Sequence, residues 1–482
     1  MTVDLTRPLD LPVLFQGGMG VAVSDWRLAG AVARVGQLGV VAGTALDVVH
    51  ARRLADGDPG GHLRLAYAHF PVPAMADSVL NRWFRPAGRP TDVRYRNVPM
   101  FTEVPSAELR ALTIMANFAE VWLAKDGHDG QVGINYLEKV QLPTPYAVWG
   151  AMLAGVDAVL MGAGIPAGIP ALLNALADGD PVTYRHTVTG AAADDDFSLR
   201  FDPTEVMGSP APRLARPPFL AIVSSHTLAM FLAKDPATRP DGFVVEGASA
   251  GGHNAPPRGP RQLDELGQPI YGQRDQVDLT RLAGTGLPFW LAGGYADPDQ
   301  LVAALAAGAA GVQVGTAFAL CAESGIAPEL KRSMVAAALA GDATVFTDPD
   351  ASPSGYPFKV VRLPGTIGDP SVSATRERVC DLGFLREAFK QDDGTVGYRC
   401  PSEPVDAYVR KGGAIEDTVG RLCLCNGLLA TVQLGQVRVG KVEAPLVTAG
   451  DDLEKVVQVF AGDSGSWTAA DVVHHVMSTH GS

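Results

Sequence analysis

The sequence lacks several features that point to particular classes of protein. It holds no uncharged apolar run of about 18 residues, the minimum for a membrane-spanning helix. Its first residues, MTVDLTRPLDLP, include acidic side chains instead of the apolar segment of a signal peptide. Only 5 cysteines occur in 482 residues, too few for a secreted disulfide framework. We therefore expect a cytoplasmic protein without membrane segments.

Positive charge is also scarce. Lysine and arginine number 39 against 52 aspartate and glutamate, so the formal net charge is −13. Nucleic acids and anionic membrane surfaces bind basic faces, so neither is expected as the main partner. Apolar residues and glycine are plentiful, at 47% of the chain and 54 positions. Such a composition is typical of a globular protein with a large core.

Short apolar runs bounded by glycine or other turn residues recur up to about residue 345. Runs of this kind fit strands that are buried on both faces of a parallel sheet, and helical patterns lie between them. About eight strands alternating with helices predict an α/β fold, the (β/α)8 TIM barrel, with a doubly wound open sheet as the alternative. The expected strands are 12–15, 38–43, 132–137, 158–161, 219–223, 242–245, 288–292 and 311–316, with a further one at 182–185.

Two regions depart from this alternation. Residues 45–130 are interrupted by segments rich in proline, arginine and aromatic residues, and we interpret them as an insertion after the second strand. The insertion would fold over one end of the barrel or serve as an oligomer contact, for example in a homodimer. We predict a barrel domain over 1–345 and a C-terminal α-rich extension over 346–482, packed on the barrel.

The stretch DGFVVEGASAGGHNAPPRG, residues 241–259, carries the clearest chemical signal. Its apolar strand runs into Glu246, the pair Gly251-Gly252, and His253. Adjacent glycines let the backbone approach a flat or anionic ligand, because no Cβ is present to clash. A histidine just beyond them could exchange a proton with that ligand. The alternative is a glycine-rich turn with a surface histidine.

Four glycine turns follow apolar strands, at 17–18, 251–252, 293–294 and 315–316. In a parallel barrel they would all lie at the same face. The last two follow neighbouring late strands, and that corner is where barrel enzymes commonly bind phosphate. Backbone N–H groups at such turns hold a phosphate without a lysine. The turns together predict a phosphorylated cofactor.

These motifs resemble a known family. The segments are Gln16 to Gly20, Glu246-Gly247-x-x-x-Gly251-Gly252-His253, Ala292 to Gly294, and Gly311-x-x-x-Gly315-Thr316. Together they are similar to the nitronate monooxygenase family, which also includes FMN-dependent enoyl-ACP reductases of the same barrel fold. The resemblance covers roughly residues 10–345 apart from the insertion, and it implies non-covalent FMN as the cofactor.

The resemblance also implies roles for individual residues. His253 would be the catalytic residue beside the flavin, and a reference pKa near 6.5 suits it to proton exchange. The FMN phosphate would lie on the two late glycine turns, and the flavin ring against the backbone at the first turn. The implied cofactor-binding residues are Gly18, Met19, Asn135, Glu246, Ala250, Gly251, Ala292, Gly293, Gly294, Gly315 and Thr316.

By the same resemblance, the reaction oxidises a nitronate or a related small carbon acid, and O2 reoxidises the flavin. One alternative is an FMN-dependent reductase of an enoyl thioester, on CoA or on a carrier protein, with NAD(P)H as the hydride source. Another is a flavin-binding barrel without turnover, whose insertion and extension dock a partner. Oxygen uptake with a nitronate and NADH oxidation with an enoyl thioester distinguish the first two.

The loop at 255–276 suggests a substrate contact. It is long and polar, and it follows the carboxyl end of a predicted strand. Arg258, with Arg261 and Arg274, could bind an anionic substrate through a bidentate contact. Arginines in such a loop are also commonly only solvated.

Four of the cysteines fall within 46 residues: Cys380, Cys400, Cys423 and Cys425. Four thiolates can hold zinc or an iron–sulfur cluster, but the usual C-x2-C spacing is absent. In a strand, the C-L-C segment would instead point two small buried side chains to one face. We predict no metal site, with the thiolate site as the alternative.

Overall fold

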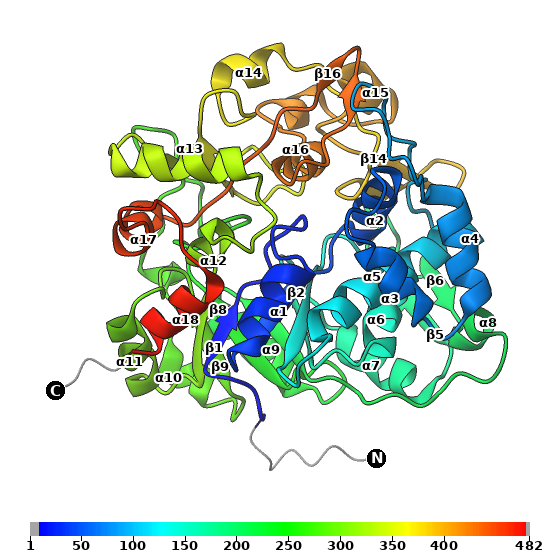
Figure 1. Cartoon of the computed structure of the whole chain (residues 1–482), viewed down its shortest axis with the longest axis horizontal. Coiled ribbons are helices and arrows are strands. Elements are labelled where there is room, and N and C mark those ends of the chain that lie inside the picture. The colour runs from blue at the N-terminus through cyan, green and yellow to red at the C-terminus, as the bar shows by residue number, and fades with distance from the viewer. Residues whose placement is uncertain (1–8, 479–482) are drawn as a thin grey trace.

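The computed structural model describes residues 9–478. Eight parallel strands form one sheet in the order β1-β10-β9-β8-β7-β4-β3-β2 (Figure 1). Their bounds are β1 Leu14–Gln16, β2 Gly39–Ala42, β3 Val132–Leu137, β4 Ala158–Gly162, β7 Phe219–Val223, β8 Gly242–Glu246, β9 Phe289–Ala292 and β10 Gly311–Val314.

The sheet closes on itself between its first and last strands. Phe15 of β1 forms a parallel bridge with Leu38, just before β2. The Gln16 N–H donates to the Leu38 carbonyl at 2.9 Å, and the Leu38 N–H donates to the Leu14 carbonyl at 3.1 Å. The predicted (β/α)8 barrel is therefore confirmed, and the open sheet is excluded.

The interior of the barrel is filled by side chains that alternate along the strands. Nine buried residues form this inner cluster. Its largest members, Phe15 and Trp290, stack with ring centroids 4.5 Å apart. The Trp290 indole N–H donates to the Pro12 carbonyl at 3.0 Å, so its one polar atom is satisfied. The barrel is thus a packed core, and only its mouth is available to a ligand.

Helices between consecutive strands form the outer layer: α1 Trp26–Arg34, α5 Ala107–Lys125, α6 Thr144–Leu153, α7 Ile169–Asp178, α9 His226–Lys234, α10 Leu279–Ala283 and α11 Pro298–Ala306. The eighth position is taken by α18, Ala469–Val476, which packs between α1 and α11. The end of the chain therefore returns from the extension to complete the barrel. None of the helices between residues 9 and 478 has both the length and the apolar character needed to cross a bilayer.

The region after β2 contains three added helices, α2 Leu46–Ala55, α3 His62–Ala68 and α4 Pro73–Trp83. The next helix, α5, packs on α1 and α6 as a barrel helix does. It lies inside the predicted 45–130 insertion, so only the part before it is additional to the barrel. A second addition follows α7: β5 Val182–Arg185 pairs with β6 Ser198–Phe201 in an antiparallel hairpin outside the barrel, and α8 Pro203–Met207 follows.

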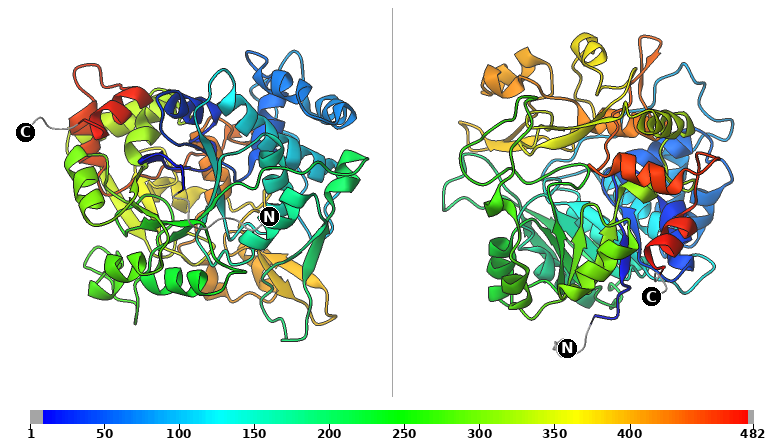
Figure 2. Two further views of the ribbon diagram at one scale, coloured as in Figure 1. Left: turned by 90° about the horizontal axis from the view of Figure 1, so that it is seen from below. Right: turned by 90° about the vertical axis from the view of Figure 1, so that its left-hand side faces the viewer.

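The remaining chain lies over one end of the barrel (Figure 2, right). It includes strands as well as helices, in three antiparallel hairpins. Cys423 and Cys425 lie at the start of a helix, so the expectation of a C-L-C strand is wrong. The elements are α12 Thr316–Leu320, α13 Pro328–Leu339, β11 Thr344–Asp348, β12 Phe358–Arg362, α14 Pro370–Thr375, β13 Glu387–Lys390, β14 Val396–Arg399, α15 Val405–Arg410, α16 Leu424–Thr431, β15 Val437–Arg438, β16 Lys441–Val442 and α17 Leu453–Phe460.

A buried ion cluster ties α2 to the barrel helices. The Arg53 guanidinium contacts Glu120 at 2.7 Å and Asp25 at 2.9 Å, and His50 contacts Glu120 at 3.1 Å. Burial raises the pKa of Asp25; Glu120 is also buried, but Arg53 and His50 hold its pKa below its usual range. Glu120 therefore depends on Arg53 for compensation of its lost hydration, and Asp25 depends on Arg53 together with Arg27, which contacts it at 2.9 Å.

Replacing this guanidinium tests the cluster. Arg53→Leu leaves the buried Glu120 without a guanidinium partner and leaves Asp25 with Arg27 alone, so we expect a loss of about 3–5 kcal/mol in the free energy of unfolding. The control is Arg82→Leu, which breaks an exposed pair with Glu108 at 3.2 Å and should cost at most about 1 kcal/mol. Denaturant unfolding of the two variants measures the difference, and equal losses would contradict the assignment.

Candidate active site

A single cavity opens at the carboxyl ends of the barrel strands, under the extension. Residues that end or follow seven of the eight strands line it, together with Ile222 of β7. All four glycine turns reach it. Each residue of the predicted cofactor set lines this cavity, as does His253: Gly18, Met19, Asn135, Glu246, Ala250, Gly251, Ala292, Gly293, Gly294, Gly315 and Thr316.

Glycine is required at these turns for two different reasons. At Gly18 an added Cβ would lie 2.4 Å from the Asn135 Cβ, so only glycine permits this close approach. Gly293 and Gly294 have φ of +101° and +86°, in the left-handed region. A Cβ on Gly294 would meet no protein atom within 4 Å, so this side of the turn faces open space in the cavity.

The first turn is shaped by a buried polar network. The Gln16 side-chain amide donates to Ser24 Oγ at 2.8 Å and accepts from the Val40 N–H at 2.9 Å. Ser24 Oγ in turn accepts from the Met19 N–H and donates to the Gly17 carbonyl, both at 2.9 Å. Sequence reasoning did not identify this role of Ser24. The available signal was the position of Ser24 shortly after the Gln16 to Gly20 segment.

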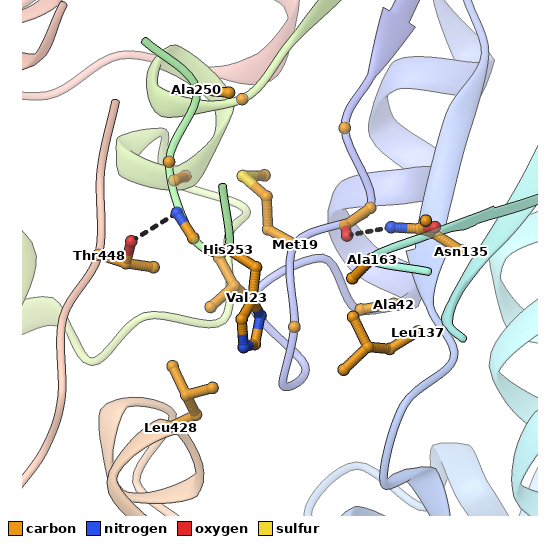
Figure 3. A pocket seen from close by; sticks show the side chains of 18 of the residues that line it. Met19, Val23, Ala42, Asn135, Leu137, Ala163, Ala250, His253, Leu428 and Thr448 are labelled. Atoms are coloured by element: carbon orange, nitrogen blue, oxygen red, sulfur yellow. Dashed lines mark hydrogen bonds between the residues drawn. The ribbon is translucent and has the colours of Figure 1, made fainter. Parts of the chain in front are cut away.

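Two buried amide oxygens at the cavity have no hydrogen-bond partner among the described residues. Asn135 donates its Nδ2 to the Gly18 carbonyl at 2.9 Å, but its Oδ1 is unpaired (Figure 3). Gln313 Oε1 is unpaired as well, and both residues line the cavity. An unsatisfied buried acceptor costs about 1–3 kcal/mol. A ligand with N–H or O–H donors would recover that free energy.

His253 projects into the cavity from the turn after β8 (Figure 3). One ring nitrogen, Nε2, lies 2.7 Å from Ser352 Oγ, and the ring meets Phe358 edge-on at 4.9 Å. Burial lowers the pKa of His253 to about 4, so the imidazole is neutral at neutral pH. Ser352 is fully buried and comes from the extension, 99 residues along the chain. Nothing in the local sequence marked it as a partner of His253.

Glu246 ends β8 at the edge of the same cavity. Burial raises the pKa of its carboxyl to about 7, and no nearby cation opposes this shift. This carboxyl is therefore protonated far more readily near neutral pH than an ordinary glutamate, and in that form it can donate a hydrogen bond as well as accept one.

A segment of the extension, between residues 448 and 452, forms another wall of the cavity. The Gly252 N–H donates to Thr448 Oγ1 at 2.8 Å, and the Gly450 N–H donates to Thr316 Oγ1 at 3.0 Å. Asp452 follows, and burial raises the pKa of its carboxyl. Beside the last glycine turn, an ionised Asp452 would oppose an anionic ligand, and a protonated one would donate to it.

The predicted substrate contact at Arg258 is not part of this cavity. Arg258 is exposed, and its backbone N–H donates to Asp275 Oδ1 at 2.8 Å. It lines a separate small cavity behind Glu246, with Tyr271. Arg261 forms an ion pair with Asp350 at 2.7 Å. Because the loop folds away from the mouth, its arginines do not face the glycine turns.

A second groove adjoins the cavity. Val140, Phe384 and Leu385 line both spaces. The groove runs between the segments that follow β3 and β5 and the β13–β14 hairpin. Its charged residues of both signs are Asp47, Glu138, Lys139, Arg386, Glu387, Arg399, Asp417 and Arg421. It offers room for a substrate longer than the cavity alone would hold.

Comparison with known proteins identifies part of the chain. Residues 219–362, from β7 to β12, match the family model of nitronate monooxygenase. This part of the chain resembles the nitronate monooxygenase family. The match includes the His253 turn and both late glycine turns, and it extends into the first hairpin of the extension.

Curated relatives agree with this family. A nitronate monooxygenase of Pseudomonas aeruginosa is 36% identical over 150 residues, 31% of this chain and 39% of the relative. A (3aS,4S,5R,7aS)-5-hydroxy-7a-methyl-1-oxo-octahydro-1H-indene-4-carboxyl-CoA dehydrogenase of Mycobacterium tuberculosis is 34% identical over 141 residues, 29% of this chain and 35% of the relative. The chain thus spans little more than a third of the length of these curated relatives. Both names are those of oxidoreductase enzymes.

Solved structures align over nearly the whole chain at low similarity. FabK from Thermotoga maritima has 16% identity and a TM-score of 0.46, covering 97% of this chain and 93% of that chain. Nitroalkane oxidase from Streptomyces ansochromogenes has 16% identity and a TM-score of 0.42, covering 98% and 96%. Because these similarities are low, the fold of this chain is established by its own strand order and barrel closure.

The raised pKa of Glu246 predicts a pH-dependent stability. Between about pH 4.5 and 7 the folded state binds more protons at Glu246 than the unfolded state, so stability falls as pH rises through this window. Glu246→Gln removes this loss. In flavin-free protein we expect the variant to exceed the wild type by up to about 3 kcal/mol near pH 8 and to match it near pH 4.

Denaturant unfolding at the two pH values measures the effect. Glu265→Gln, at an exposed position of the 255–276 loop, is the matched control and should show no pH-dependent gain. A gain for Glu246→Gln that is the same at both pH values would show that packing, and not ionisation, is responsible.

Proposed function

We propose that this protein is an FMN-dependent oxidoreductase that oxidises a nitronate or a related small carbon acid with O2. One observation carries the proposal. Four glycine turns, two unpaired buried acceptors and a neutral histidine face the same cavity. The relationship to nitronate monooxygenase supplies the chemical class.

The residues at the cavity fit FMN. The phosphate would lie on the turns at Gly293-Gly294 and Gly315-Thr316, where backbone N–H groups and open space meet. The unpaired oxygens of Asn135 and Gln313 would accept from the N–H and O–H donors of the cofactor. Asp452 lies at the same corner, and the raised pKa of its carboxyl reduces the cost of placing an anion beside it. When bound, FMN supplies the redox chemistry, taking electrons from the substrate and passing them to O2.

The state of His253 indicates which form of the substrate it meets. A pKa lowered to about 4 makes the imidazole a weak base, so removing a proton from a neutral carbon acid is unfavourable. A nitronate arrives already deprotonated. The protein then needs only to orient the anion and hold it close to the cofactor. His253, positioned by Ser352 at 2.7 Å, orients the anion, whose charge would favour protonation of the imidazole.

A second function is supported by the groove beside the cavity. Its basic residues, Lys139, Arg386, Arg399 and Arg421, could contact the phosphates of a long thioester substrate. The CoA dehydrogenase relative is consistent with such a substrate. This alternative is an FMN-dependent reductase of an enoyl thioester with NAD(P)H.

The cofactor assignment predicts a yellow protein that releases FMN on denaturation. Gly294→Asp places a carboxylate in the phosphate turn, so we expect FMN affinity to fall at least about tenfold by charge repulsion. Gly286→Asp is the control, because Gly286 also has a positive φ, +71°, and no atom within 4 Å of its added Cβ, but lies away from the cavity. Flavin fluorescence titration measures both. Equal FMN affinity in the two variants would contradict this phosphate site.

Turnover in air tests the reaction. We expect oxygen uptake with a nitronate to exceed that with the parent nitroalkane, because His253 is a weak base. His253→Ala should keep the flavin spectrum and lose about 10–100-fold in kcat/KM, the contribution of one hydrogen bond to a charged group. NAD(P)H oxidation driven by an enoyl thioester, without nitronate-dependent oxygen uptake, would favour the second function. A flavin that no substrate reduces would indicate a binding protein without turnover.

A further inference from the structure

The four cysteines of the extension gather around one small cavity. Cys380 lies between α14 and β13, Cys400 directly follows β14, and the other two lie at the start of α16. All four are free thiols. This cavity shares three lining residues with the candidate active site: Leu385, Leu424 and Cys425.

The arrangement does not suit a metal. Among residues 9–478, no group of three or more histidine, cysteine, aspartate or glutamate side chains is placed to hold a metal ion. The Cys423 thiol is already engaged: it donates to the Val379 carbonyl at 3.6 Å and accepts from Asn426 Nδ2 at 3.5 Å. The remaining neighbours are Cys380 and Cys400, which line the same small cavity closely enough for the ionisation of each thiol to depend on the other.

The two thiols of this pair differ in character. The neighbouring Cys400 thiol lowers the pKa of Cys380, and the Arg386 guanidinium lowers it further against the effect of burial. The same proximity and burial raise the pKa of Cys400. Cys380 is partly exposed, whereas Cys400 is 5% exposed. A more acidic, accessible thiol next to a protonated one is the arrangement of an attacking and a resolving cysteine.

We propose that Cys380 and Cys400 form a reversible disulfide when the protein meets hydrogen peroxide. The Cys380 thiolate attacks one peroxide oxygen, the O–O bond breaks, and a sulfenic acid forms on Cys380 as hydroxide leaves. Cys400 then attacks that sulfur, the S–S bond forms, and water leaves. The two thiols lose two electrons and two protons, and the peroxide becomes two waters.

The position of the pair connects this chemistry to the candidate active site. Residues 381–399 lie between the two cysteines and include the β13–β14 hairpin. Phe384 and Leu385 of this segment line the active-site cavity, and much of the segment lines the adjoining groove. A disulfide would close this segment into a covalent loop and restrict it. Oxidation therefore restricts the segment that forms one wall of the active-site cavity.

Thiol counting after peroxide treatment tests the proposal on the full chain. Free thiols, counted in denaturant, should fall from five to three, and a dithiol reductant should restore five. Peptide mapping should find Cys380 joined to Cys400. Cys400→Ser should stop at a sulfenic acid on Cys380, detected with a sulfenic-acid-specific reagent. Cys321→Ser, at a buried position outside the cluster, should form the same cross-link as the wild type.

Three results would overturn the proposal. They are five thiols remaining after peroxide, a cross-link between a different pair of cysteines, and stoichiometric zinc or iron in the purified protein. The wild-type measurements decide these outcomes alone, so a variant that fails to fold does not leave the question open.

Discussion

Closure of eight parallel strands is the constraint on which the rest of the structure depends. Because every strand runs in the same direction, each carboxyl end opens at the same face. Turns that are nearly 300 residues apart, from Gly18 to Gly315, therefore line one cavity. The closing bridge between Phe15 and Leu38 fixes the first turn relative to the last, since β1 pairs with β10 on its other side. A site distributed over so many segments requires a closed scaffold to hold its parts in register.

The extension contributes as much to the site as to the shape of the molecule. Its first hairpin pairs with the His253 turn: the Asn254 N–H donates to the Pro357 carbonyl and the Lys359 N–H donates to the Gly252 carbonyl, both at 2.9 Å. The buried Lys359 ammonium also contacts Asp451 at 2.7 Å, which ties this hairpin to the segment between residues 448 and 452 that lines the cavity. His253 is consequently held from both sides by chain beyond the barrel strands. Removing the extension would expose it to water and release its Ser352 contact.

The barrel and the lining of the site could be predicted because their signals are local. A buried strand, a glycine turn and the residue after it are adjacent in sequence, and barrel geometry then brings them together. The roles of Ser352, Thr448 and Asp452 could not be predicted, because each arises from a contact between distant segments. Arg258 is the converse case, in which a local signal did not give the position of the side chain in the fold. Its position after a strand suggested the cavity, but the path of its loop, held by Asp275, points it elsewhere. That α18 completes the barrel was equally hidden, since its helical pattern does not reveal its partners.

The polar groups of the cavity reduce the free energy of unfolding when no ligand is bound. Unpaired oxygens on Asn135 and Gln313 and a Glu246 carboxyl with a raised pKa all lower the stability of the ligand-free fold. Destabilising groups of this kind occur at functional sites, where a bound molecule offsets the stability that they cost. A ligand that satisfies these groups stabilises the folded state by an amount that grows with its concentration relative to its Kd. The same groups that define recognition therefore couple occupancy of the cavity to the stability of the barrel.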